Sequence, residues 1–281
     1  MHHTDDKDDP VFHDQFKTFM ENQLEWHRST AFRVAREGSP AVTVLAYFFR
    51  EASDVQPHFD YLECAIRETW RHCGMLRTVL AVNERFPCIE KFAEAFSPYV
   101  EIQVEKSLVP GNIDSLSADC IGKMHQRFST PYVMTIQDDG FPVRPGLEEF
   151  IGKADFIAAP RFSVRNLWYV RLMRRLLREC PFNGGFSLRS AKICRLAARH
   201  WERGWKDKPF SFDMIDDVFY TSTLPRTSLS YRLRVNACDV GLGYRFSIEG
   251  DYPVDTKRPP FGFHSPQAFC RLFNEGHVRL E

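Results

Sequence analysis

The feature that most constrains the fold is a continuous apolar run from Ala41 to Phe49, followed by a regular alternation of strand-like and helix-like segments. A strand that is apolar at every position is typical of a sheet buried on both faces. Further strands are predicted at 76–82, 99–104, 132–136 and 154–159, and helices at 58–74, 89–96, 113–128, 190–205 and 213–223. This spacing requires crossover connections, so it predicts an α/β fold with a mostly parallel central sheet.

The length of the chain, 281 residues, fits one large α/β domain. Residues 1–10 are polar and acidic and are predicted to form a disordered tail. Residues 11–38 place Phe12, Phe16 and Phe19 at helical spacing and predict an N-terminal helical extension. Residues 39–281 then form the main domain, whose first half is expected to be the nucleotide-binding sheet.

Charge and cysteine content narrow the class of protein. Lys+Arg and Asp+Glu both number 37, so nothing in the net charge indicates a nucleic-acid partner. The eight cysteines are scattered without a CxxC pair, which predicts buried free thiols rather than a zinc site or a disulfide framework. We also see no signal peptide and no apolar stretch of about 20 residues. These observations together predict a cytoplasmic protein.

The first chemical motif is Gln137-Asp138-Asp139-Gly140, which follows the strand predicted at 132–136. Ligands of open α/β sheets bind beyond the carboxyl ends of the strands. Two adjacent carboxylates at such a point are costly unless they are solvated, hydrogen-bonded or bound to a cation. Oxygen ligands of this kind suit Mg²⁺ or Mn²⁺, whereas the alternative is an exposed Asp-Gly turn.

Three further motifs have a functional and a structural interpretation each. The glycine pair in Asn183-Gly184-Gly185 lets the backbone approach a ligand closely, but Asn-Gly is also a common turn. Asp213, Asp216 and Asp217 lie in the first turns of the helix predicted at 213–223, where an aspartate serves either as a general base or as a partner of the helix dipole. His264 follows a segment of prolines and phenylalanines, Pro259 to Phe263, which is expected to be rigid. A lone histidine is more often structural than a metal ligand.

Taken in order, these motifs resemble those of the GT-A glycosyltransferases, and within that class the family formerly catalogued as DUF5672. The resemblance covers roughly residues 42–264 and is carried by Gln137-Asp138-Asp139, Asn183 to Arg189, Asp216-Asp217-Val218-Phe219, Phe246-Ser247-Ile248-Glu249 and Phe261 to His264. The sequence departs from the family pattern at Asp216, where glutamate is usual, and at Asp138, which adds an acid to the first motif. The resemblance implies a GT-A fold, that is, a Rossmann-like, mostly parallel central sheet flanked by helices.

The resemblance also implies a mechanism. A metal-dependent glycosyltransferase would move a sugar from a nucleotide-sugar donor to a saccharide or a lipid-linked saccharide. Asp139 and His264 would hold Mn²⁺ or Mg²⁺, which would neutralise charge on the departing nucleoside diphosphate. Asp217, with Asp216 beside it, would deprotonate the acceptor hydroxyl, and the configuration at the anomeric carbon would be inverted.

The same resemblance assigns binding roles to further residues. The donor would be bound by side chains near the sheet edge and by the glycine loop, namely Phe48, Phe49, Arg50, Lys123, Asp138, Gly184 and Gly185. The aromatic residues could stack on a base, although core packing is the alternative for Phe48. The acceptor would be bound by Asn183, Phe186 and Arg189.

Two other functions remain open from the sequence. A metal-dependent nucleotidyltransferase also joins an acidic strand end to a nucleotide, but residues 49–53 lack the glycine such enzymes usually have there. A non-catalytic glycan-binding module would leave Asp217 without a purpose. A basic helix predicted at 166–180 is either a solvated amphipathic helix or a peripheral contact with an anionic membrane.

Overall fold

The computed structural model describes residues 10–29, 37–160, 182–236, 240–249 and 258–278. Its centre is a six-stranded sheet in the order β3-β2-β1-β4-β6-β5. The strands are β1 (Val42–Phe48), β2 (Thr78–Val82), β3 (Val100–Val104), β4 (Tyr132–Ile136), β5 (Phe156–Pro160) and β6 (Phe182–Ser190). The first four are parallel, and β6 runs antiparallel to both β4 and β5.

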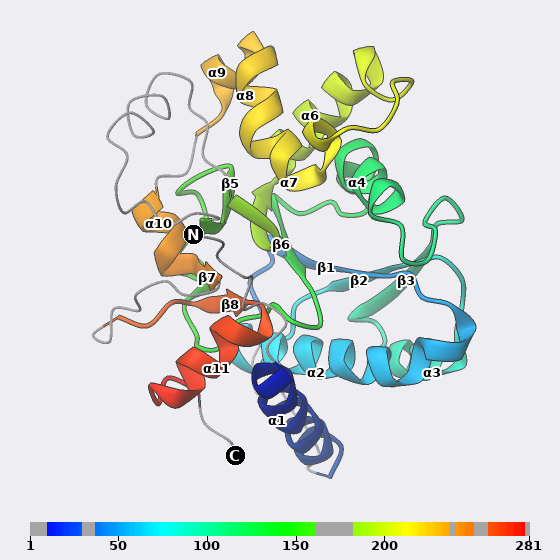
Figure 1. Cartoon of the computed structure of the whole chain (residues 1–281), viewed down its shortest axis with the longest axis vertical. Coiled ribbons are helices and arrows are strands. Elements are labelled where there is room, and N and C mark those ends of the chain that lie inside the picture. Colours follow the sequence, from blue (N-terminus) through cyan, green and yellow to red (C-terminus); the bar gives the residue numbers. More distant parts are fainter. Residues whose placement is uncertain (1–9, 30–36, 161–181, 237–239, 250–257, 279–281) are drawn as a thin grey trace.

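Helices cover both faces of this sheet (Figure 1). The longer ones are α2 (Val55–Cys73), α3 (Pro87–Ala95), α4 (Ile113–Gly122) and α6 (Ala191–Gly204). Helices α2 and α3 lie on one side of the sheet, and α4 and α6 lie on the other (Figure 1). The predicted α/β fold, with a mostly parallel central sheet flanked by helices, is confirmed by this arrangement.

Local sequence explains where several helices begin and end. The side chain of Asn112 accepts a hydrogen bond from the Ser115 amide and caps α4, and Ser190 caps α6 through the Ile193 amide. Gly74 follows α2 with a φ of +82°, a conformation that glycine adopts without strain. Helix α4 is shorter than the helix predicted at 113–128, because the chain tightens into a 3₁₀ turn at Met124–Gln126.

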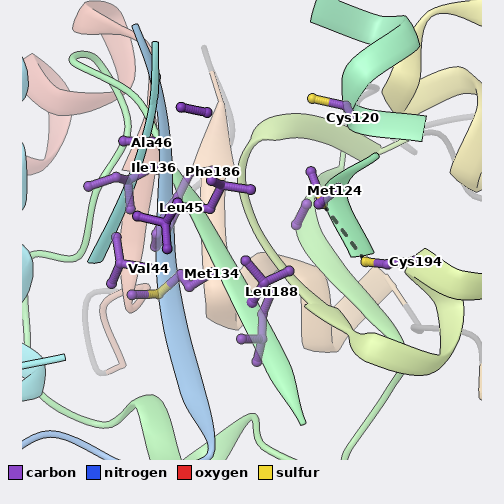
Figure 2. Close-up of a cluster of buried hydrophobic side chains, with 14 of the residues drawn as sticks. Val44, Leu45, Ala46, Cys120, Met124, Met134, Ile136, Phe186, Leu188 and Cys194 are labelled. Carbon is purple, nitrogen blue, oxygen red and sulfur yellow. Dashed lines mark hydrogen bonds between the residues drawn. The ribbon is translucent and has the colours of Figure 1, made fainter. Parts of the chain in front are cut away.

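Strands β1, β2, β4 and β5 are buried because they are mainly apolar on both faces. Figure 2 shows side chains of β1, β4 and β6 in one cluster, among them Leu45, Met134 and Leu188, all three fully buried. Met124 and Cys194 extend this cluster toward α6, with their sulfur atoms 3.8 Å apart. The six described cysteines are free and five of them are buried, as the sequence predicts.

The N-terminal helix α1 (Pro10–Ser29) packs on the main domain, against α2 and against α11 (Pro266–Asn274) (Figure 1). It contributes Phe16 and Phe19 to a second apolar cluster that also contains Phe141, Phe263 and Phe269. A buried hydrogen bond of 2.7 Å between His27 and Glu68 joins α1 to α2. The predicted N-terminal helical extension is therefore present and forms part of the domain's surface layer.

The remaining described elements are short. They are α7 (Asp216–Val218), α8 (Leu224–Thr227), α9 (Leu229–Arg234), α10 (Val240–Phe246), β7 (Ser247–Glu249) and β8 (Gly262–His264). The helix predicted at 213–223 is broken into a 3₁₀ turn, α7 and a π-helical turn. The basic helix predicted at 166–180 lies outside the described residues. No helix in the described part of the chain has both the length and the apolar character to cross a membrane.

Candidate active site

A cleft opens where the chain connections of the sheet diverge. After β1 the chain leads to β2 and β3 on one side, whereas β4 borders β6 and β5 on the other. Such a switch point leaves a crevice at the carboxyl ends of the strands. The crevice has a volume of about 270 Å³, and its lining residues are Tyr47, Phe48, Phe49, Arg50, Leu62, Gly111, Ile113, Leu116, Gln137, Asp138 and Asp139.

The motif after β4 forms a tight turn at one wall of this cleft. The amide of Gln137 donates to the Gly140 carbonyl at 3.1 Å, and the Gly140 amide donates back at 3.2 Å. Asp138 and Asp139 therefore occupy the tip of the turn, and each side chain is 34% exposed. Their carboxylates are accessible to a ligand, which fits both the predicted cation site and its alternative, an exposed Asp-Gly turn.

His264 lies beside this turn at the end of β8. The amide of Ser265 donates to the Asp139 carbonyl at 2.8 Å, which fixes β8 against the turn. His264 Nε2 lies 3.6 Å from Asp139 Oδ1 and 3.0 Å from Gln137 Oε1. Two ligands that share one Mg²⁺ or Mn²⁺ at about 2.1 Å each lie about 3–4 Å apart, so these atoms have a suitable spacing.

A glycine leaves the space that this group of side chains occupies. A Cβ atom on Gly185 would lie 2.2 Å from His264 Nε2 and 2.6 Å from Gln137 Oε1. Within the described ranges, no group of three His, Cys, Asp or Glu residues could hold a metal ion on its own. A cation bound by Asp139 and His264 would therefore need other ligands, such as the Gln137 amide oxygen, water or phosphate. This is the usual situation for Mg²⁺ in phosphate-handling sites.

The charges at the turn favour a cation nearby. Burial and the negative charge of Asp139 raise the pKa of Asp138 to about 6, and the charges of Arg50 and His264 act in the opposite direction. Arg50 Nη2 lies 4.0 Å from Asp138 Oδ2. Arg50, just after β1, and the turn from Gln137 to Gly140 thus share one electrostatic environment. A positive group bound there would relieve the repulsion between the two carboxylates.

The predicted glycine loop is instead the first part of β6, which corrects the sequence interpretation. Antiparallel pairing places Ser187 to Arg189 between β4 and β5, and Phe182 pairs with Pro160, whereas the two glycines lie at the irregularity between these pairs. Gly184 and Gly185 contact different partners: Gly185 lies under His264, and a Cβ atom on Gly184 would lie 3.0 Å from Asp216 Oδ2 and 3.1 Å from Asp217 Cβ. The glycine pair therefore separates the candidate metal ligands from the two aspartates of α7.

Arg189 and Phe186 are enclosed by the fold. Arg189 is 1% exposed, and its guanidinium lies over the rings of Phe156 and Tyr220, 5.1 and 4.7 Å from their centroids. Phe186 is fully buried and stacks on Phe246 at 4.8 Å. Neither side chain is therefore accessible for direct contact with an acceptor, contrary to the prediction from the sequence.

The two aspartates of α7 differ in their surroundings. Asp216 Oδ2 accepts a hydrogen bond of 2.9 Å from Arg189, so the carboxylate of Asp216 neutralises the buried guanidinium of Arg189. Asp217 is 4% exposed and lies beside Gly184. Asp217 is not among the described residues that line the 270 Å³ cleft. The predicted role of Asp217 at the acceptor remains a proposal.

Asn183 belongs to a hydrogen-bond network that could not be predicted from the sequence. Its Nδ2 donates to Glu249 Oε1 at 2.8 Å, and its Oδ1 accepts from the Gly185 amide at 2.9 Å. Glu249 ends β7 and lies directly opposite His264 in the β7–β8 pair. Glu249 is part of a motif that carries the family resemblance, but only the structure brings it next to the histidine.

The other predicted donor contacts divide into two groups. Phe49 and Arg50 are partly exposed and line the cleft. Phe48 lines it too, but its ring is 4% exposed and packs edge-on against Phe59, which favours a core role. Lys123 points elsewhere, because its Nζ lies 3.0 Å from Glu105 Oε2 and it is not among the described lining residues.

Tyr47 and Gln137 are lining residues that the sequence interpretation did not select. The Tyr47 hydroxyl donates to the buried Asp119 at 3.0 Å, which fixes the ring at the cleft wall. A polar residue that directly follows a buried strand is the only sequence signal that singles out Gln137. Tyr47 lies inside an apolar run and gives no such signal.

Comparison with known proteins supports the family resemblance. The sequence model of a family described as "Protein of unknown function (DUF5672)" matches residues 113–264, which is more than half of the chain. No curated protein matches the chain in sequence.

Several solved structures resemble this one in fold. The apo-form glycosyltransferase GlyE of Streptococcus pneumoniae TIGR4 is 11% identical, with a TM-score of 0.46, over 79% of this chain and 53% of its own. The galactosyltransferase LgtC is 14% identical, with a TM-score of 0.47, over 79% of this chain and 86% of its own. The mannosyltransferase Ktr4p of S. cerevisiae is 10% identical, with a TM-score of 0.42, over 79% of this chain and 74% of its own. This chain thus spans about half the length of GlyE, and we assign none of its residues from these likenesses.

Proposed function

The chain belongs to the DUF5672 family, and from the motifs in its sequence and the geometry of the cleft we propose that it is a metal-dependent glycosyltransferase of GT-A type. The donor is a nucleotide sugar, and the acceptor is a glycan or a glycolipid. The observation that carries this proposal is the pairing of Asp139 with His264, 3.6 Å apart, at the wall of a crevice at the switch point of the sheet.

The cleft has the chemistry of a nucleoside diphosphate site. Tyr47 and Phe49 supply aromatic surface for a base or a ribose, and Arg50 supplies a guanidinium for a phosphate oxygen. Asp139 and His264 hold the divalent cation, and Gln137 Oε1 is within reach as a further ligand. When bound, Mn²⁺ or Mg²⁺ neutralises the charge that develops on the leaving nucleoside diphosphate.

In this proposal Asp217 is the general base. It accepts the proton of an acceptor hydroxyl while that oxygen forms a bond to the anomeric carbon. The bond from that carbon to the diphosphate oxygen breaks, its electrons leave with the nucleoside diphosphate, and the configuration inverts. The choice of Asp217 over Asp216 follows the matched family motif, and the ion pair of Asp216 with the buried Arg189 makes Asp216 the weaker base.

A cytoplasmic location is part of the same proposal. The six described cysteines are free thiols, as is usual for proteins of a reducing compartment. A lipid-linked acceptor would bring the enzyme to a membrane surface, where the sequence at 166–180 supplies basic residues.

Calorimetric titration of UDP, GDP and CMP, each with Mn²⁺ and with EDTA, tests the proposal. We expect at least one nucleotide to bind at least tenfold more tightly with Mn²⁺. A screen of nucleotide sugars for release of nucleoside diphosphate then identifies the donor. Glycan binding without nucleotide binding would instead indicate a binding module, and release of pyrophosphate from a nucleoside triphosphate would indicate a nucleotidyltransferase.

A further inference from the structure

The two ring nitrogens of His264 face different partners, and this difference has a consequence for metal binding. We propose that Glu249 is a positioning residue, which holds the Nδ1–H of His264 so that Nε2 can bind a divalent cation. Asn183 in turn holds Glu249 in place. The inference rests on the proposed function, because it concerns the same cation site.

Glu249 and His264 are direct neighbours across two short strands. The β7–β8 register pairs Glu249 with His264, and Glu249 Oε1 lies 4.0 Å from His264 Nδ1. Both side chains are largely buried, with 8% and 12% of their surfaces exposed. Nδ1 itself is buried and has no hydrogen-bond partner within the described part of the chain. A shift of about 1 Å would bring the carboxylate and Nδ1 into hydrogen-bonding distance.

The other nitrogen determines the tautomer that this arrangement favours. Nε2 lies 3.0 Å from Gln137 Oε1, and an amide oxygen only accepts hydrogen bonds. With Gln137 as its partner, a neutral His264 therefore carries its proton on Nε2. A cation needs the lone pair of Nε2, so cation binding requires that the proton reside on Nδ1 instead.

The nearby carboxylate stabilises that second tautomer. A histidine that binds a metal usually donates its other N–H to a carboxylate, a carbonyl or water, and this fixes the ring and raises its basicity. Glu249 is the carboxylate placed for this task on the Nδ1 side. Gln137 and Glu249 thus favour opposite tautomers of one ring, and cation binding selects the one that Glu249 stabilises.

Asn183 keeps the carboxylate oriented. Its Nδ2 donates to the same oxygen, Glu249 Oε1, that is nearest to Nδ1, at 2.8 Å. Its own side chain is fixed by the amide of Gly185, the residue that lies under the imidazole. The chain of contacts therefore runs from the backbone of β6 through Asn183 and Glu249 to His264. This gives Asn183 a role toward the cation site, distinct from the acceptor contact expected from the family resemblance.

The first test measures Mn²⁺ affinity by the electron paramagnetic resonance signal of the free ion. Glu249→Gln keeps the size of the side chain and removes its charge, and loss of such an outer partner typically weakens metal binding about 10- to 100-fold. We expect a loss in that range for Glu249→Gln and a smaller loss for Asn183→Ala. Affinity within twofold of the wild type in Glu249→Gln would overturn the inference.

A matched control separates positioning from stability. Asp155 is also a buried carboxylate, but it pairs with Lys192 and is not among the described residues that line the cleft. We expect Asp155→Asn to lower the melting temperature and to leave Mn²⁺ affinity unchanged. If Asp155→Asn weakens Mn²⁺ binding as much as Glu249→Gln does, the effect of Glu249 is only structural and the inference is wrong.

A spectroscopic test follows the tautomer directly. With ¹⁵N-labelled histidine, we expect the His264 signals to change from the Nε2–H form to the Nδ1–H form when Mg²⁺ is added. Retention of Nε2–H at saturating Mg²⁺ would contradict the inference. A wild type that binds Mn²⁺ while Glu249→Gln binds it equally well would refute the role of Glu249 alone. A wild type that binds no Mn²⁺ would refute both this inference and the metal dependence in the proposed function.

Discussion

His264 Nε2 lies 3.6 Å from Asp139 Oδ1, because a short strand from the end of the chain lies against the turn that follows β4. Several contacts hold that strand against the turn. Gly262 forms a bridge with Pro142, Phe263 packs on Phe141 at 4.7 Å, and the Ser265 amide bonds to Asp139. The candidate cation site is therefore built from two segments that are far apart in sequence, and its geometry depends on the packing around Phe263.

Gly185→Ala should damage the cation site more than the fold. The new Cβ atom would lie 2.2 Å from His264 Nε2, so the imidazole must move, whereas the backbone of β6 can stay in the sheet. We expect Mn²⁺ affinity to fall at least tenfold with a small change in melting temperature. Gly204→Ala is the control, because Gly204 ends α6 with no atom within 4 Å of the added Cβ. It should leave Mn²⁺ affinity unchanged, and equal losses in the two variants would contradict this account.

Phe16→Ala should weaken the cation site from a distance. Phe16 in α1 is 7% exposed and contacts Phe263, the residue before His264, with a ring separation of 6.1 Å. Removing a buried phenylalanine side chain costs about 3–5 kcal/mol of unfolding free energy. We expect a loss of that size together with weaker Mn²⁺ binding. Val11→Ala on the same helix is 57% exposed and should change stability by less than about 0.5 kcal/mol. Full Mn²⁺ affinity in Phe16→Ala would show that α1 does not support the site.

The two neighbouring aspartates of α7 should respond differently to the same substitution. Asp216→Asn leaves the buried Arg189 without its carboxylate, and breaking such a pair costs about 3 kcal/mol. Asp217→Asn should keep nucleotide binding and lose sugar transfer, because it removes the proposed base. Denaturant unfolding and transfer assays on both variants check this. Transfer at the wild-type rate in Asp217→Asn would rule out Asp217 as the base.

The sequence predicts the parallel strands of the sheet well, because most of them are short, mainly apolar runs that need no long-range information to be recognised. Tyr132–Ile136 is the clearest case, since the observed β4 has the predicted bounds. The segment from Asn183 to Arg189 could not be read in this way. Its glycines are turn formers in isolation, and only the pairing of the residues on either side of them with β4 and β5 makes the segment a strand.

The candidate site could be predicted only where local sequence determines the position of a residue. Asp139 follows a buried strand, so its position at the sheet edge follows from local sequence. Contacts of Glu249 and Arg189 depend on which segments meet in three dimensions, and no local pattern encodes that. Arg189 looks like a ligand-binding residue in sequence, yet it lies between two aromatic rings and pairs with Asp216.

Stability should fall in acid because of Glu68 at the α1–α2 contact. Burial alone would raise the pKa of Glu68, but hydrogen bonds with His27 and His72 outweigh it and lower the pKa from 4.5 to about 2. A carboxylate with a lowered pKa stabilises the fold at pH values above its unfolded pKa, and this contribution is lost as the pH falls from about 4.5 to about 2. A shift of this size corresponds to about 3 kcal/mol.

Urea unfolding at several pH values checks this prediction. The wild type should lose stability more steeply than Glu68→Gln between about pH 4.5 and pH 2, because the variant has no carboxylate to protonate at this position. Glu84→Gln, which replaces an exposed glutamate, should follow the wild type. Parallel curves for the wild type and Glu68→Gln would contradict the assignment to Glu68.

The most direct test of a shared cation between Asp139 and His264 is calorimetric titration of a nucleoside diphosphate with Mn²⁺ and with EDTA. Wild type, Asp139→Ala and His264→Ala are compared on the same nucleotide. We predict that Mn²⁺ strengthens binding at least tenfold in the wild type and has almost no effect in either variant. If the wild type binds equally well in EDTA, or if both variants keep the full effect of Mn²⁺, the two residues do not form the proposed site.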